Sequence, residues 1–309
     1  MRLLCALGLF LALLHVTSCL LIGAFNIQCF GDRKSQDNVV MNIIKEIVLR
    51  YDIILIQEVR CNHDLSVPHR LLALVNQDSP QFSYIVSEPL PLGPDTRKER
   101  YLFLYRHQKV AVTGCFQYDE GKRGVFDRPP FVVQFSSTET DVEEFVLIPI
   151  HTSPLTAAQA AKEGKISTVE QLNALVDVVE EAKLKWTNDN IMVLGDFNAG
   201  SRYVGDDDWK NIRLRANTNF HWLIDDNVDT TMAEKPIQAH DRIVVTTEME
   251  KGVVAGSAAV FDFIKAYSPK EAKKVSDHFP VEVEVAPPKT GQKRPHSDDS
   301  SKTPKKSKP

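Results

Sequence analysis

Asp196 and Asn198 follow a run of apolar residues and bring a carboxylate and an amide to the end of that run. Residues 191–194 read Ile-Met-Val-Leu, which is typical of a strand buried on both faces. Residues two apart in an extended backbone point to the same side, so we expect these two side chains to emerge together. In open α/β sheets, ligands bind at the carboxyl ends of strands. The sequence therefore predicts a binding site here.

The same change from apolar to polar residues occurs at four other places in the chain. The polar residues there are Asn26, Glu58, His151 and the adjacent pair Asp277 and His278. Any one of them could simply cap a strand. Acids, amides and histidines at all five places instead predict one site assembled across a sheet.

Metal-assisted hydrolysis is the chemistry that these residue types favour. Carboxylates and amides without cysteine are hard ligands, which suit Mg²⁺, Mn²⁺ or Ca²⁺ better than zinc. His151 and His278 would serve as general acid and base if Glu99 and Asp241 oriented their rings, although either histidine alone could be structural. With no serine or cysteine nucleophile among these residues, water is the expected attacking group. A phosphoester is the natural electrophile, because metal and imidazolium stabilise its developing charge.

A few long helices and many short strands must position these side chains. Apolar spacing predicts helices over 37–50, with Asp37 as N-cap, over 65–77 and over 167–186. Strands are expected at 82–87, 101–105, 131–136, 144–150, 191–194, 242–245 and 281–285. This order fits two packed sheets with helices outside.

The composition indicates one folded domain with distinct ends. The chain has 309 residues, of which 43% are hydrophobic, enough for one sizeable core. Residues 1–19 have the pattern of a secretory signal peptide, with an uncleaved anchor as the alternative, and residues 20–286 form the predicted domain. No second long apolar run exists, so no stable membrane span is expected.

Residues 287–309 form a tail with seven Lys or Arg and two Asp but no apolar run, which predicts disorder. Its basic clusters fit two interpretations. One is a bipartite nuclear signal, and the other is a solvated arm that contacts polyanions such as DNA or chromatin.

Three cysteines remain after the predicted signal peptide: Cys29, Cys61 and Cys115. An odd number is unusual in a secreted protein. Cys29 and Cys61 each lie three residues past a proposed site residue, so a bridge between them is one alternative and two free thiols the other. Cys115 is predicted to be a buried thiol.

Six motifs resemble the deoxyribonuclease I family, in order and with similar spacing, from about residue 20 to residue 285. They are Ala24–Ile27, Ile56–Arg60, Lys98–Phe103, Gly195–Ala199, His240–Val244 and Ser276–Pro280. The resemblance implies an α/β four-layer sandwich of the endonuclease/exonuclease/phosphatase superfamily, with two mainly antiparallel sheets flanked by helices. It also implies a secreted, monomeric endonuclease that needs Mg²⁺ (or Mn²⁺) and Ca²⁺ and cuts double-stranded DNA with low sequence specificity.

The resemblance also implies a role for each matching residue. The implied acid–base dyads are His151 with Glu99 and His278 with Asp241. The implied metal and phosphate site comprises Glu58, the main ligand, with Asn26, Asp196, Asn198 and Asp277. Arg60 matches a minor-groove contact, Arg128 a contact to the DNA backbone, and Asp229 with Thr231 a structural calcium loop.

Departures and rival interpretations accompany this resemblance. Ser201 and Gln238 occupy positions where the family has a disulfide. Tyr84, Val86 and Glu88 match an actin-binding patch, or form an ordinary strand and turn. The basic tail resembles that of the deoxyribonuclease gamma subgroup. The alternatives are a phosphodiesterase or phosphatase acting on lipid or inositol phosphates, and a DNA- or actin-binding descendant of a nuclease. The intact dyads argue against the second.

Overall fold

The structure, a computed structural model, describes residues 19–61, 64–92, 95–119, 121, 124–232 and 237–289. The predicted signal peptide up to residue 18 and the predicted tail from residue 290 lie outside the described residues. Both assignments, and the domain boundaries drawn from them, therefore stay predictions.

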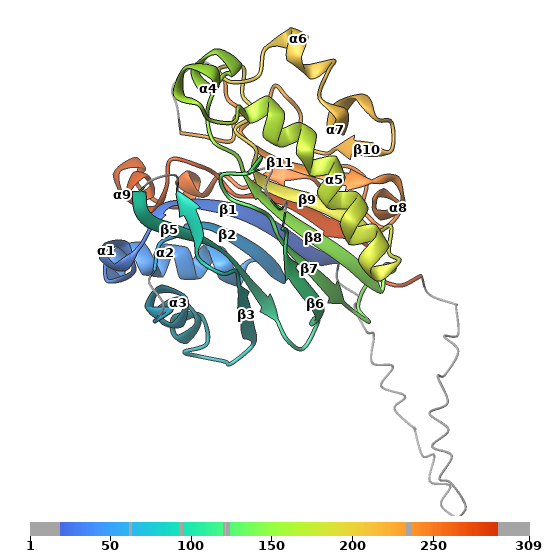
Figure 1. Ribbon diagram of the computed structural model, residues 1–309. Coiled ribbons are helices and arrows are strands. Elements are labelled where there is room, and N and C mark those ends of the chain that lie inside the picture. The colour runs from blue at the N-terminus through green and yellow to red at the C-terminus, as the bar shows by residue number, and fades with distance from the viewer. Residues whose placement is uncertain are drawn as a thin grey trace, which may run out of the picture.

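Two sheets form the centre of the molecule (Figure 1). The first contains β1 (Leu20–Phe30), β2 (Ile53–Val59), β3 (Phe82–Val86), β4 (Leu90–Leu92), β5 (Asp95–Arg106), β12 (Ala259–Val260) and β13 (Val281–Val285), in the order β12-β13-β1-β2-β5-β3 with β4 on β5. The second contains β6 (Ala111–Gln117), β7 (Phe131–Ser136), β8 (Glu144–His151), β9 (Ile191–Asp196), β10 (Phe220–Trp222) and β11 (Asp241–Thr246), in the order β10-β11-β9-β8-β7-β6. Most pairs are antiparallel, but β1–β2 and β8–β9 are parallel.

Three apolar clusters give the molecule its layers. Leu55, Phe103, Leu147 and Leu194 belong to the cluster that joins the two sheets. A second cluster lies beneath α2 (Asn38–Leu49), α3 (Ser66–Val75) and α9 (Pro269–Val275), and a third lies beneath α5 (Thr168–Trp186). The smaller helices are α1 (Asp32–Ser35), α4 (Ala157–Glu163), α6 (Asp206–Trp209), α7 (Arg213–Ala216), α8 (Thr247–Glu250) and η1 (Phe263–Ala266). The predicted four-layer sandwich is confirmed.

The three predicted helices form where side chains satisfy their first amide groups or apolar faces meet a sheet. Asp37 accepts from the amides of Val39 and Val40, as expected of an N-cap. Ser167 and Glu170 form a capping box at the start of α5. Helix α3 begins without a side-chain cap, so its buried residues rather than its first turn fix it.

The structure decides between the two alternatives for Cys29 and Cys61, and it contradicts the prediction for Cys115. Cys29 and Cys61 are both free. Cys29 has φ 52° and an exposed side chain, whereas the Cys61 side chain is buried. The prediction of a buried Cys115 is wrong, because it lies exposed on β6, an edge strand that the sequence patterns did not indicate. In the part of the chain that is described, no helix is both long and apolar enough to cross a bilayer.

Candidate active site

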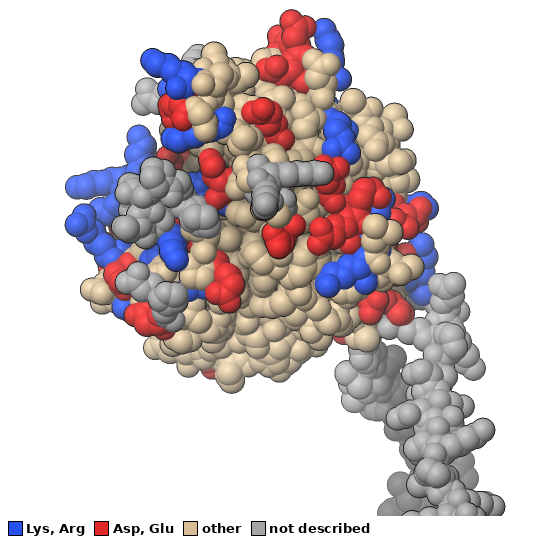
Figure 2. Space-filling model, in the orientation of Figure 1, with Lys and Arg blue, Asp and Glu red and all other residues tan. Residues whose placement is uncertain are grey.

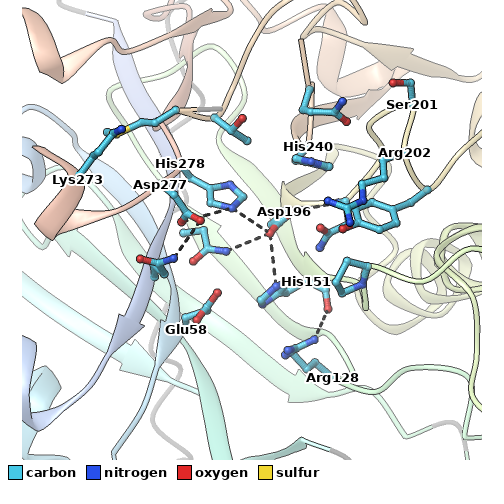
Figure 3. Close-up of a pocket in the computed structure, with 18 residues that line it drawn as sticks. Glu58, Arg128, His151, Asp196, Ser201, Arg202, His240, Lys273, Asp277 and His278 are labelled. Carbon is cyan, nitrogen blue, oxygen red and sulfur yellow. Dashed lines mark hydrogen bonds and ion pairs between the residues drawn. The ribbon is translucent and has the colours of Figure 1, made fainter. Parts of the chain in front are cut away.

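A pocket of about 1060 Å³ gathers most of the predicted site residues (Figure 3). Those that line it are Asn26, Glu58, Arg128, His151, Asp196, Asn198, Thr231, Asp277 and His278. Glu99, Asp241, Arg60 and Asp229 are not among the lining residues. The polar clusters far apart in sequence therefore do meet at one edge of the two sheets.

Asp196 lies at the centre of this pocket (Figure 3), because strand register places it between the neighbouring site residues. It pairs with His151 across the parallel β8–β9 ladder and with Asp241 across the antiparallel β9–β11 ladder. Its Oδ2 lies 3.4 Å from His151 Nε2 and 3.8 Å from His278 Nε2, and accepts from Asn26 Nδ2 at 3.0 Å. Burial raises the pKa of Asp196, but the rings of His278, His151 and His240 outweigh it and lower the pKa overall.

His278 is held closely by Asp241. Its Nδ1 lies 2.7 Å from Asp241 Oδ2, which also accepts from the buried Thr230 hydroxyl at 2.8 Å. Burial lowers the pKa of His278, but the Asp241 and Asp196 carboxylates raise it to about 10. Burial in turn raises the pKa of Asp241. The predicted pairing of these two residues is present in the structure.

His151 lies farther from its carboxylate. Its Nδ1 is 3.5 Å from Glu99 Oε2, while Arg128 Nε donates to the same oxygen at 2.6 Å and Arg60 Nη2 donates to Oε1 at 3.0 Å. Burial raises the pKa of Glu99, but His151 and the two arginines outweigh it and bring the pKa to about 2. The two arginines with predicted DNA contacts thus both bind Glu99.

Glu58 reaches the pocket from an irregular point in β2. It has φ 57°, and the pairing of β2 with β1 and with β5 shifts register around it. Such a bulge re-aims a side chain that regular alternation would direct elsewhere. Glu58 Oε2 accepts from the Cys29 amide at 2.8 Å and from Arg60 Nη2 at 2.9 Å. Strand β1 likewise continues past Asn26, so these two residues are not strand ends as the sequence suggested.

The predicted reason for the placement of Asn198 is wrong, although Asn198 does line the pocket. Strand β9 ends at Asp196, and Asn198 has φ 46°, so the segment is not extended. The Asn198 amide donates to Asp196 Oδ1 at 2.9 Å in a tight turn, and its Nδ2 donates to the Thr152 carbonyl at 2.9 Å. The turn, rather than strand alternation, brings both side chains to the pocket.

Ser276 ties the last motif to the first strand. Its hydroxyl donates to the Asn26 carbonyl at 2.6 Å and accepts from the His278 amide at 3.0 Å. Gln28 Nε2 donates to Asp277 Oδ2 at 3.0 Å. These contacts fix Asp277 and His278 on the side of the pocket formed by the first sheet.

Several residues of the site were missed in the sequence. Gln57 is fully buried and joins the two sheets, since its amide donates to the Ile150 carbonyl and accepts from the Asp196 amide. A Cβ at Gly195, where φ is 124°, would lie 2.6 Å from the same Ile150 oxygen, so only glycine fits there. Thr230 orients Asp241. Gln57 is a polar residue within the otherwise apolar strand β2, and this was the sequence signal that could have identified it.

Four further pocket residues were also not predicted as functional: Arg202, Tyr203, His240 and Lys273. Lys273 and Arg202 lie on opposite sides of the pocket (Figure 3). Ser201 and Gln238, at the positions of the family's disulfide, line it as well. Lys273 lies on α9, which the sequence patterns did not indicate, and the others lie outside helices and strands, where no periodic pattern marks them, so only the fold could assign them.

The residues predicted to bind calcium and actin have defined positions in the structure, and their roles stay predictions. Asp229 Oδ1 accepts from the Thr231 amide at 3.2 Å, closing a local turn beside the pocket. Tyr84 lies on the edge strand β3, where its hydroxyl is 3.0 Å from His69 Nε2. Val86 is the last residue of this strand, and Glu88 lies beyond its end.

The donor atoms of the site fit a hard divalent cation. Oδ1 of Asn26 and Oδ1 of Asp241 are buried and have no hydrogen-bond partner among the described residues. Ligand atoms of Asp196, Asp241 and His278 lie within 4.8 Å of one another. Unpartnered buried oxygens beside carboxylates are the surroundings that Mg²⁺ or Mn²⁺ prefers.

Comparison with known proteins gives the class first. Residues 23–278 match the model of the Endonuclease/Exonuclease/phosphatase family. A Bacteroides vulgatus protein of that family superposes with a TM-score of 0.59 at 16% identity, covering 87% of this chain and 99% of its own. The human Nocturnin catalytic domain superposes with a TM-score of 0.56 at 13% identity, covering 87% and 94%. These structures support the fold alone.

Proteins similar in sequence identify the family to which the chain belongs. Deoxyribonuclease-1 of Bos taurus is 45% identical over 287 residues, which cover 89% of this chain and 96% of the relative. Deoxyribonuclease gamma of Homo sapiens is 39% identical, covering 90% and 89%. The chain belongs to the deoxyribonuclease I family.

Proposed function

We propose that this protein is an endonuclease that hydrolyses phosphodiester bonds of double-stranded DNA with low sequence preference. The observation that carries the proposal is the pair of histidines on either side of Asp196, each with its own carboxylate partner. The names of the relatives at 39–45% identity supply the substrate.

Hydrolysis requires one proton to leave the attacking water and one to reach the leaving oxygen. His151, whose carboxylate partner is bound by two arginines, accepts the proton of the water as a new P–O bond forms. His278, kept protonated by Asp241 and Asp196, donates a proton from Nε2 to the leaving oxygen as the other P–O bond breaks. Asp196, between the two rings, keeps both directed into the pocket.

The residues that would hold a divalent cation are Glu58, Asn26 and Asp196, with Asn198 and Asp277 shaping the phosphate site. A bound Mg²⁺ or Mn²⁺ would polarise the phosphate and neutralise charge in the transition state. The unpartnered Oδ1 of Asn26 supports this role. Asp229 and Thr231 would form a separate, structural Ca²⁺ loop.

Positive side chains around the pocket suit a phosphate backbone. Arg128, Arg202 and Lys273 line it, and Arg202 and Lys273 form no ion pair within the described residues. Figure 2 shows Lys and Arg gathered over α1 and α9, and Asp and Glu over α8. Contacts of this kind position a duplex without reading its sequence.

The remaining proposals follow from the sequence patterns at the two ends of the chain and from the family resemblance. We propose secretion through the N-terminal signal peptide, action as a monomer, and binding of monomeric actin through Tyr84, Val86 and Glu88. The basic tail would extend contact with chromatin or direct the protein to the nucleus. Deleting residues 288–309 should leave cleavage of naked DNA largely intact and weaken cleavage of chromatin. Equal loss on both substrates would reject the role in chromatin contact.

Digestion of supercoiled plasmid by the purified protein tests the main proposal. We expect nicked circles to appear before linear DNA with Mg²⁺ or Mn²⁺, Ca²⁺ to enhance the reaction, and chelator to abolish it. Sphingomyelin and a phosphoinositide serve as rival substrates. Faster cleavage of either lipid than of DNA would reverse the assignment of substrate.

A further inference from the structure

Arg60 lies next to the pocket and is bound to two carboxylates of the site. Glu58 and Arg128 line the pocket, but Arg60 does not. One nitrogen of its guanidinium, Nη2, donates to Glu58 Oε2 at 2.9 Å and to Glu99 Oε1 at 3.0 Å, and Nε donates to Glu99 Oε1 at 3.2 Å. One side chain thus joins the carboxylate that would hold the cation to the carboxylate that faces His151.

A hydrogen bond fixes the backbone at Arg60. Its amide donates to the Phe30 carbonyl at 2.8 Å, directly after the bulge at Glu58. Glu58 Oε2 takes both the Arg60 guanidinium and the Cys29 amide, so the other oxygen of Glu58 is left for a cation. Glu58 therefore has one oriented oxygen and one available oxygen.

Glu99 is bound at both of its oxygens. Arg60 binds Oε1, while Arg128 and His151 lie at Oε2. Its side chain is only 2% exposed, so these contacts are poorly screened by water. A planar guanidinium holds carboxylates in a defined orientation, which an ammonium group does less well.

We propose that Arg60 is a positioning residue that couples the metal-binding carboxylate Glu58 to the Glu99–His151 pair. This inference rests on the proposed function and adds to it, because a DNA contact alone would not require a guanidinium bound to both carboxylates. With Arg60 removed, two neighbouring carboxylates lose their shared counter-ion. Both the orientation of Glu58 and the place of His151 then change together.

The test compares Arg60→Ala with wild type on a substrate that has no groove. Bis(4-nitrophenyl) phosphate measures chemistry alone, supercoiled plasmid measures chemistry and DNA contact, and binding of Mn²⁺ followed by electron paramagnetic resonance needs no substrate. We expect kcat to fall about 10–100-fold on both substrates and Mn²⁺ affinity to weaken several-fold, as for other residues that support metal ligands. Arg60→Lys should lose less of each.

Arg213→Ala is the matched control, because Arg213 is an ion-paired arginine on α7, bound to Asp177 at 2.9 Å. It should behave as wild type. Unchanged kcat on the small diester together with unchanged Mn²⁺ affinity in Arg60→Ala, with loss confined to plasmid KM, would overturn the proposal. If Arg60→Ala lacks the native near-ultraviolet spectrum, Arg60→Lys carries the same comparison. If wild type cleaves neither substrate, the proposed function fails, and Mn²⁺ binding still decides the coupling.

Discussion

The two histidine–carboxylate pairs face each other across Asp196, but their carboxylates have different partners. Asp241 is bound by a neutral hydroxyl and lies 2.7 Å from His278. Glu99 is bound by two guanidinium groups and lies 3.5 Å from His151. The carboxylate of Asp241 therefore interacts with a histidine and a neutral hydroxyl, whereas that of Glu99 interacts with His151 and with two arginines. Similar residue types thus surround the two imidazoles with different charges, and only His278 has a closely bound carboxylate that raises its pKa, to about 10.

The largest expected effect is the loss of either histidine. His151→Ala and His278→Ala should each reduce plasmid nicking by about 10²–10⁴-fold, because each removes one of the two proton transfers. Circular dichroism should show that both variants remain folded. Near-normal nicking by either variant would reject the two-histidine mechanism and the comparison of the two histidine–carboxylate pairs that is based on it.

The carboxylates should then differ in importance. Asp241→Asn should lower kcat about 100-fold, because it removes the charge that keeps His278 protonated and correctly oriented. Glu99→Gln should cost about tenfold, since the arginines already offset much of the charge of Glu99. Steady-state kinetics on plasmid would measure both. A greater loss in Glu99→Gln would reverse the assignment.

A substrate with a better leaving group distinguishes the residue that acts as general acid from the residue that acts as general base. Bis(4-nitrophenyl) phosphate releases a stabilised phenolate that needs little protonation. We expect His278→Ala to lose about tenfold less activity on this diester than on plasmid, and His151→Ala to lose equally on both. The opposite pattern would exchange the two roles.

The smallest expected effect is on the stability of the metal-free protein. Glu99 should contribute to a loss of stability at low pH, and His278 to a loss at high pH. The pKa of Glu99 is lowered to about 2, so its contribution is present above about pH 4.5 and lost as the pH falls toward 2. The pKa of His278 is raised to about 10, so its contribution is present below about pH 6.5 and lost as the pH rises toward 10.

Urea unfolding in chelator would measure this contrast. Glu99→Gln should flatten only the acid limb of the pH profile and His278→Ala only the alkaline limb, each by about 1 kcal/mol or more. Wild-type profiles in both variants would show that these charge interactions contribute little to the folded state.

Much of the fold could be predicted because its signals are local. Asp37 and Ser167 start helices through their own nearby amides, and the apolar runs of β8 and β9 identify buried strands. Strand β6 was missed because three of its seven residues are exposed and none is buried, so it has no apolar run. Helix α9 was missed although Ser268 and Glu271 form a capping box, because only two of its seven residues are buried. Short elements depend on packing more than on pattern.

The sequence by itself determined the residue types at the site, their order and the family to which they belong. Only the tertiary structure decided that Asp196 lies between two histidines, that a turn places Asn198, and that Arg60 and Arg128 both bind Glu99. The physical reason is that these contacts join strands and loops from distant parts of the chain. Their distances depend on sheet register and bulges, which no local pattern encodes.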